Sequence, residues 1–109
     1  GTVTTTDGAL DSSSMRLTLP TDSVWLIEAV IIGTKDDLSE SATYKISGIY
    51  RNNSGTAALV GSVSTDSYED TAGWNGALGV NGAQVRFQTT GAAGSTVNWR
   101  VHANCRELG

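Results

Sequence analysis

Apolar and polar residues alternate along most of this chain, and no segment shows the 3.6-residue period of a helix. Alternation with a period of two is typical of strands that are buried on one face. Seven segments alternate in this way or are apolar throughout, and turn-forming residues separate them. These predicted strands cover residues 15–19, 24–34, 42–51, 56–64, 74–80, 83–89 and 96–106. The pattern predicts an all-β fold, either an antiparallel β-sandwich of jelly-roll type or a small barrel.

Glycine, asparagine and proline mark the predicted turns. Asn81-Gly82 lies between two predicted strands and is the strongest hairpin signal in the chain. Charged loops are expected at 35–41 and 65–73. Residues 1–14 are small and polar, which predicts a linker or an N-terminal arm before a domain at 15–109. Because the chain begins with glycine rather than methionine, we expect it to be a fragment of a longer protein.

The strand at 24–33 is apolar on both faces, interrupted only by Glu28. An antiparallel strand with one face in water should be polar on that face. Two apolar faces need two covers, and a second sheet supplies only one. We therefore expect another copy of the chain to supply the second, so that a charge at an outward-facing Ile27 or Ile31 would break assembly. The first face carries Val24, Leu26, Val30 and Ile32, and the second face, predicted as the oligomer interface, carries Trp25, Ile27, Ala29 and Ile31.

Charge and hydropathy argue against two kinds of partner. The formal net charge is −4, and the few arginines are scattered along the chain. Because phosphate binding needs clustered lysine and arginine, we expect no nucleic-acid partner. No apolar run approaches the roughly 20 residues of a membrane-spanning helix, so we expect no membrane insertion.

No group of residues has the pattern of an active site, and the sequence predicts neither enzymatic activity nor a cofactor. His102 lies on the polar face of the last predicted strand, where an exposed or interface role is expected. Cys105 cannot form an intrachain disulfide and shares the apolar face of that strand, which predicts a buried thiol. Acidic residues in 36–40 and 66–70 leave a Ca²⁺ site open, although no EF-hand pattern is present. Asn52-Asn53-Ser54 matches the glycosylation triplet.

Aromatic residues beside hydrogen-bonding groups at loop tips are the candidates for ligand binding. Two such clusters occur, one beside each of two predicted turns, and a tryptophan opens the strand after the second. The predicted ligand-binding residues are Tyr50, Arg51, Asn52, Asn53, Tyr68, Glu69, Asp70 and Trp74.

From about Val24 to Leu108, the order of these features resembles a small β-sandwich domain that closes many tail-fibre proteins of tailed bacteriophages. No single piece is specific, but the pieces occur together in this order. They are Val24–Val30, Ala42–Gly48, Ala58–Val63, the acidic Glu69-Asp70 before Trp74, and Thr90–Trp99. The chain departs from the common pattern at Asp36–Ser41, at His102 and at Cys105.

The resemblance implies a homotrimeric, receptor-binding fibre tip without catalytic residues. Such a tip is assembled in the host cytoplasm, carried on the virion, and binds a glycan such as lipopolysaccharide, or an outer-membrane protein, during host adsorption. The sequence leaves two alternatives open. One is a structural domain that trimerises or caps a fibre, or decorates a capsid, and the other is a carbohydrate-binding module attached to an enzyme.

Overall fold

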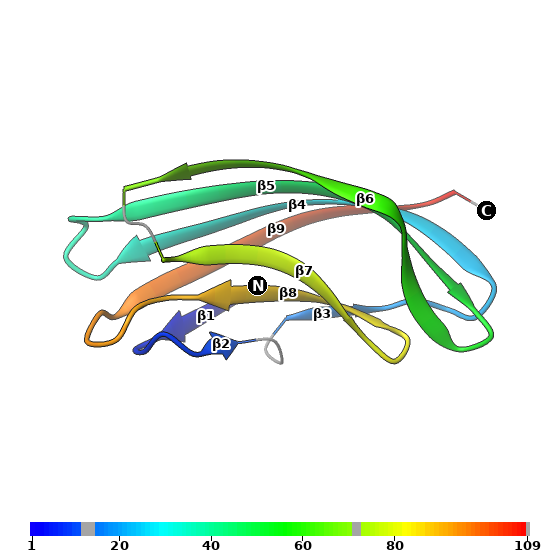
Figure 1. Cartoon of the computed structure of the whole chain (residues 1–109), viewed down its shortest axis with the longest axis horizontal. Coiled ribbons are helices and arrows are strands. Elements are labelled where there is room, and N and C mark those ends of the chain that lie inside the picture. Colours follow the sequence, from blue (N-terminus) through cyan, green and yellow to red (C-terminus); the bar gives the residue numbers. More distant parts are fainter. Residues whose placement is uncertain (12–14, 71–72, 109) are drawn as a thin grey trace.

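A computed structural model describes residues 1–11, 15–70 and 73–108 as an all-β arrangement of antiparallel strands in two facing sheets (Figure 1). The described residues contain nine strands and no helix. The strands are β1 (Thr2–Thr5), β2 (Leu10–Asp11), β3 (Arg16–Thr18), β4 (Ser23–Lys35), β5 (Ser41–Asn53), β6 (Thr56–Glu69), β7 (Asn75–Asn81), β8 (Gln84–Thr90) and β9 (Val97–Glu107).

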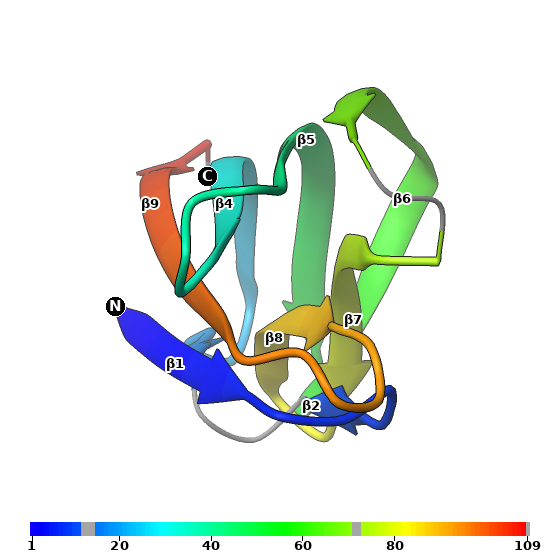
Figure 2. The ribbon, with the colours of Figure 1, turned by 90° about the vertical axis from the view of Figure 1, so that its left-hand side faces the viewer.

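The larger sheet has five strands in the order β1-β9-β4-β5-β6. Its strands β4, β5, β6 and β9 are 11 to 14 residues long and run almost the full 44 Å length of the molecule (Figure 1). In the smaller sheet, β8 pairs with β7 on one side and with β2 and β3 on the other. Figure 2 shows the two sheets facing each other, with β9 and β6 on opposite sides of the larger one.

The hydrophobic core fills the space between the sheets. Trp99 lies at its centre, with Trp74 and Tyr44 packed against it at ring-centroid distances of 5.9 and 6.4 Å. The Trp99 indole N–H donates a hydrogen bond to Thr5 Oγ1 at 3.0 Å, so the one polar atom of this ring is satisfied. The strand register explains the position of the ring, since Gly33 lies opposite Trp99 and leaves room for it.

The predicted oligomer interface is wrong, because its residues face this core. Ile27, Ala29 and Ile31 are almost fully buried between the chain's own two sheets, and Trp25 is partly buried against the same core. The smaller sheet therefore covers the face that we expected another copy to cover. Parity placed these four residues together, but it could not say which of the two apolar faces points inward.

The other apolar face of β4 points outward and is half-buried within the single chain. The residues of this face alternate along β4 with the buried residues Ile27, Ala29 and Ile31. Several of them lie opposite long side chains of the neighbouring strands. Val24 lies opposite Arg51, Val30 opposite Lys45, and Ile32 opposite Arg100. Long side chains can lay their methylene stems over apolar neighbours while keeping their charges in water. The outer face thus has a partial cover that requires no second copy.

The seven predicted strands are all present with end shifts of a few residues, and the structure adds β1 and β2 from the segment predicted as a linker or arm. β1 pairs with β9 and β2 pairs with β8, so residues 2–11 contribute to both sheets. The linker interpretation is therefore wrong for these residues, and residues 12–14 lie outside the described part. The predicted loop at 65–73 is also too long, because β6 continues to Glu69.

Two hairpins fix the register of neighbouring strands. In the β7–β8 hairpin, Asn81 pairs with Gln84, so the loop is Gly82-Ala83 rather than the predicted Asn81-Gly82. Gly82 has a φ of 56°, which the first position of a type II′ turn requires. In the β5–β6 hairpin, Ser54 and Gly55 both have positive φ, the feature of a type I′ turn.

Candidate functional site

Three of the predicted ligand-binding residues are buried. Tyr50 and Trp74 are 2% and 3% exposed and belong to the core. Asn52 is 1% exposed, and its amide closes the hairpin by donating from Nδ2 to the Leu19 carbonyl at 2.8 Å and accepting from the Gly55 N–H at 2.8 Å. These three predictions are wrong. The same burial keeps Asn52 from being a glycosylation site in the folded chain.

The other five predicted residues are exposed, but the fold separates them into two groups. Arg51 and Asn53 lie at the β5–β6 hairpin, and Tyr68 to Asp70 lie at the opposite end of the same two strands (Figure 1). Because Tyr68 and Glu69 pair with Thr43 and Ala42, about 27–37 Å of strand separates the two groups. They do not form one site.

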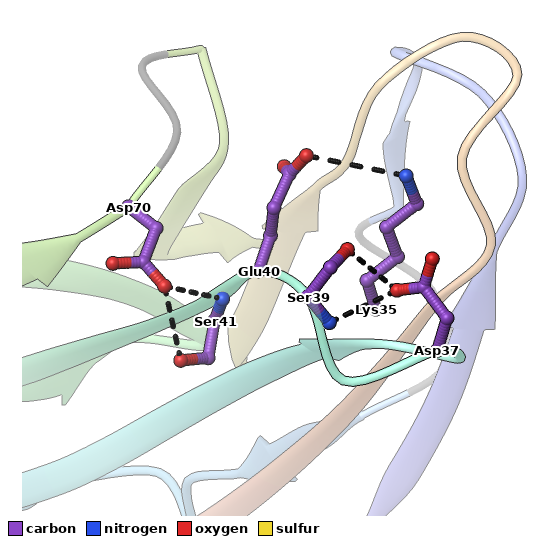
Figure 3. Close-up of polar contacts among 6 residues, drawn as sticks. All are labelled: Lys35, Asp37, Ser39, Glu40, Ser41 and Asp70. Carbon is purple, nitrogen blue, oxygen red and sulfur yellow. Dashed lines mark hydrogen bonds and ion pairs between the residues drawn. The ribbon is translucent and has the colours of Figure 1, made fainter.

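At the end of the sheet that carries Tyr68 to Asp70, acidic side chains form hydrogen bonds within and between the loops. As Figure 3 shows, Asp70 accepts a hydrogen bond from the Ser41 N–H at 3.1 Å, and Asp37 accepts from the Ser39 N–H and hydroxyl at 2.9 and 2.6 Å. The hydrogen bond from the Ser39 hydroxyl is the main reason why the pKa of Asp37 lies below its usual value. Residues 1–11, 15–70 and 73–108 include no group of three or more histidine, cysteine, aspartate or glutamate side chains that could hold a metal ion.

Glu69 is also engaged. It accepts a hydrogen bond from the Tyr44 hydroxyl at 2.7 Å. The pKa of Tyr44 is raised above its ordinary value, mainly by burial and secondly by this hydrogen bond. The phenol therefore stays a neutral donor. Tyr68, at 63% exposed, is the member of this cluster that is free to meet a partner.

An open groove of about 480 Å³ lies on the outer face of the larger sheet, and we name it the outer groove. It spans β9, β4, β5 and β6 at the middle of their length. Its outward-facing side chains come from two adjacent rows of the sheet, each row formed by residues in register across the four strands. The rows are His102, Val30, Lys45 and Asp66, and Asn104, Glu28, Ser47 and Ser64.

The alternation of the strands explains why these polar groups gather. On β4 the inward positions 27, 29 and 31 carry the core residues, so position 28 must point outward. The same holds on β9, where Val101 faces the core and His102 does not. Residues that lie directly opposite each other on neighbouring antiparallel strands point to the same face of the sheet. Polar side chains from four strands are thereby brought into one surface.

The outer groove is rich in groups that hydrogen-bond to a polar ligand. Glu28 and Asp66 offer carboxylate acceptors, Lys45 offers an ammonium, and Asn104 offers both a donor and an acceptor. Val30 gives the floor an apolar element. The groove is open to solvent along the sheet, and such an arrangement suits binding a chain with many hydroxyl groups.

Cys105 takes no part in this surface. It shares the inward face of β9 with Val101 and is partly buried against the core. Burial raises the pKa of its thiol, which keeps the sulfur protonated and weakly reactive. The prediction of a buried thiol is therefore confirmed in part.

Sequence reasoning missed the outer groove, because its residues come from four strands that are far apart in the chain and because Asp66 was predicted to lie in the loop at 65–73. His102 was expected to be exposed, but nothing in the sequence placed it in a row with Asp66. The available signal was charge inside a predicted strand, since Glu28 and Lys45 each lie within a strand rather than in a loop. Asp66 gave no such signal, because the strand that carries it was predicted to end at residue 64.

In the part of the chain that the structure describes, no helix is long and apolar enough to span a membrane. Comparison with protein-family models, with curated proteins and with solved structures finds no match to this chain.

Proposed function

We propose that this chain is a non-enzymatic binding domain that recognises a cell-surface glycan through the outer groove. The observation that carries the proposal is the gathering of two carboxylates, an ammonium, an amide and an imidazole over four strands in one open groove. Carboxylate and amide groups hydrogen-bond well to hydroxyls, and bonds to charged groups are the stronger ones. A sheet surface holds these groups in fixed rows, which favours recognition of a regular polymer.

The biological setting that we propose is the receptor-binding tip of a bacteriophage tail fibre. The order of segments from Val24 to Leu108 supports it, as does an all-β domain with antiparallel sheets. We propose that the domain is a β-sandwich of jelly-roll type and acts as a homotrimer on the virion. Three open grooves on one fibre, and several fibres on one particle, would then raise avidity without a deep site.

A structural role in trimerising or capping a fibre is the second candidate. It is favoured by β6, a 14-residue strand at the edge of the larger sheet that pairs on one side only. Such an edge is a template for pairing with another chain. A structural domain would assemble but would bind no host glycan.

The test is binding of the fluorescently labelled domain to a panel of bacterial strains, with purified lipopolysaccharide as competitor. We expect a subset of strains to be labelled, and we expect Asp66→Ala and Asn104→Ala to weaken this binding by about tenfold each, the effect of losing about 1.4 kcal/mol of hydrogen bonding.

Asn53→Ala is the matched control, since Asn53 is also an exposed strand asparagine but lies at the distant hairpin. All three variants should keep the thermal stability of the parent, because all three side chains are exposed. Labelling of no strain by a well-folded domain would favour the structural role. Equal binding by the Asp66, Asn104 and Asn53 variants would refute the outer groove as the site.

A further inference from the structure

A second hollow, of about 430 Å³, lies on the same outer face between the outer groove and the loop at 36–40, and we name it the loop-end hollow. It is formed by the last residues of β4, the loop that follows, and the first half of β9. Its lining includes Ile32, Lys35, Asp36, Asn98, Arg100 and His102.

The two hollows meet at His102, which lines both of them. Along the outer face of β9, Asn98 and Arg100 lie in the loop-end hollow, His102 lies at the junction, and Asn104 lies in the outer groove. Four outward positions in a row along one strand span about 20 Å. An extended ligand that lies along the outer face of β9 would therefore contact both hollows.

The two hollows differ in charge. The loop-end hollow has Lys35 and Arg100 against one carboxylate, Asp36. The outer groove has the opposite balance, with Glu28 and Asp66 against Lys45.

Arg100 is the cation at the loop-end hollow that remains available. Its side chain is exposed on the outer face of β9, opposite Ile32. No ion pair to it occurs among the described residues, whereas the Lys35 ammonium lies 4.0 Å from Glu40 Oε1. A guanidinium binds carboxylate and phosphate groups through paired hydrogen bonds.

We propose that the ligand is an extended glycan with an acidic substituent, whose carboxylate or phosphate is bound by Arg100 while its hydroxyl-bearing part lies in the outer groove. This inference rests on the proposed glycan-binding function and adds to it the chemical class of the glycan and its direction along β9. His102, at the junction, contacts the sugar that links the two parts.

The experiment uses polysaccharide released from a strain that the labelled domain binds. Three samples are compared: untreated, carboxyl-reduced and dephosphorylated. We expect one of the two treatments to weaken binding by about tenfold, and its identity reports whether the acidic group is a carboxylate or a phosphate. Arg100→Gln should weaken binding of the untreated sample by a similar factor and should remove the effect of that treatment.

Arg106→Gln is the matched control, because Arg106 is an exposed arginine on the same face of the same strand but lines neither hollow. It should leave binding within about twofold of the parent. Binding that is indifferent to both treatments and to Arg100→Gln, but still sensitive to Asp66→Ala, would overturn the acidic-ligand inference and leave the glycan-binding function standing. Failure to bind any strain would contradict the proposed function itself.

Discussion

Replacing Ile31 by alanine is expected to destabilise the domain by about 2–5 kcal/mol. The substitution leaves a cavity in the core, and the surrounding side chains fill such a cavity only in part. Ile31 is fully buried between the two sheets, at the level of Gly76 and the core ring of Tyr44. This loss is a large part of the free energy of unfolding, which is roughly 5–15 kcal/mol for native proteins. Urea denaturation followed by tryptophan fluorescence measures it.

The neighbouring variant Ile32→Ala is the matched control. Ile32 is the same residue type on the same strand, but it points to the outer face and is only half-buried. We expect a loss of about 1 kcal/mol, in proportion to the smaller area removed from water. Equal losses for the two variants would contradict the assignment of faces, and so would an Ile31 variant that keeps its stability but changes its state of association.

Gly33→Ala is expected to cost about 1–3 kcal/mol by overpacking. An added methyl group would lie 2.6 Å from the six-membered ring of Trp99, closer than such atoms approach, and the ring is held by Trp74, Tyr44 and its hydrogen bond to Thr5. The near-ultraviolet circular dichroism of the tryptophans and the urea midpoint should both change.

Gly8→Ala provides the comparison for this variant. A methyl group at Gly8 would meet only backbone atoms at 4.0 Å, and the residue is exposed. Its stability should stay within about 0.5 kcal/mol of the parent, as for most surface substitutions. Should Gly33→Ala be tolerated as well as Gly8→Ala, the packing of Trp99 against Gly33 would be refuted.

Strand positions were predictable because alternation and turn residues are local signals. β4 was expected at 24–34 and is found at Ser23–Lys35, and the hairpin at Asn81-Gly82 is displaced by one residue. The pairing of β1 with β9 was not predictable, since nothing at Thr2–Thr5 indicates a partner almost a hundred residues away. Small polar residues fit an edge strand and a linker equally well.

The choice between the two faces of β4 illustrates a further limit. Val30 and Ile31 are equally apolar, and only the position of the second sheet decides which one is inside. Neighbouring long side chains such as Lys45 partly cover the outward residue. A strand that is apolar on both faces therefore does not by itself require an oligomer.

Two of the predicted ligand residues are buried for a related reason. Tyr50 was chosen because it stands beside polar residues in sequence, and Trp74 because it opens a strand after the acidic loop. Side chains adjacent in a strand point to opposite faces, so a polar neighbour does not make a residue exposed. The outer groove joins Glu28 to Asn104, residues far apart in the chain, through the order of strands in the sheet. That order is a property of the fold and is absent from any local pattern.

The central claim is that the outer groove binds a glycan, and an NMR titration tests it most directly. The isotopically labelled domain would be titrated with polysaccharide from a strain that it binds. We expect the perturbed amides to follow the two rows of the groove, at Glu28, Lys45, Asp66, His102 and Asn104. Perturbations confined to the hairpin tip at 53–56 or to the loop at 36–40, with the groove amides unchanged, would contradict the claim.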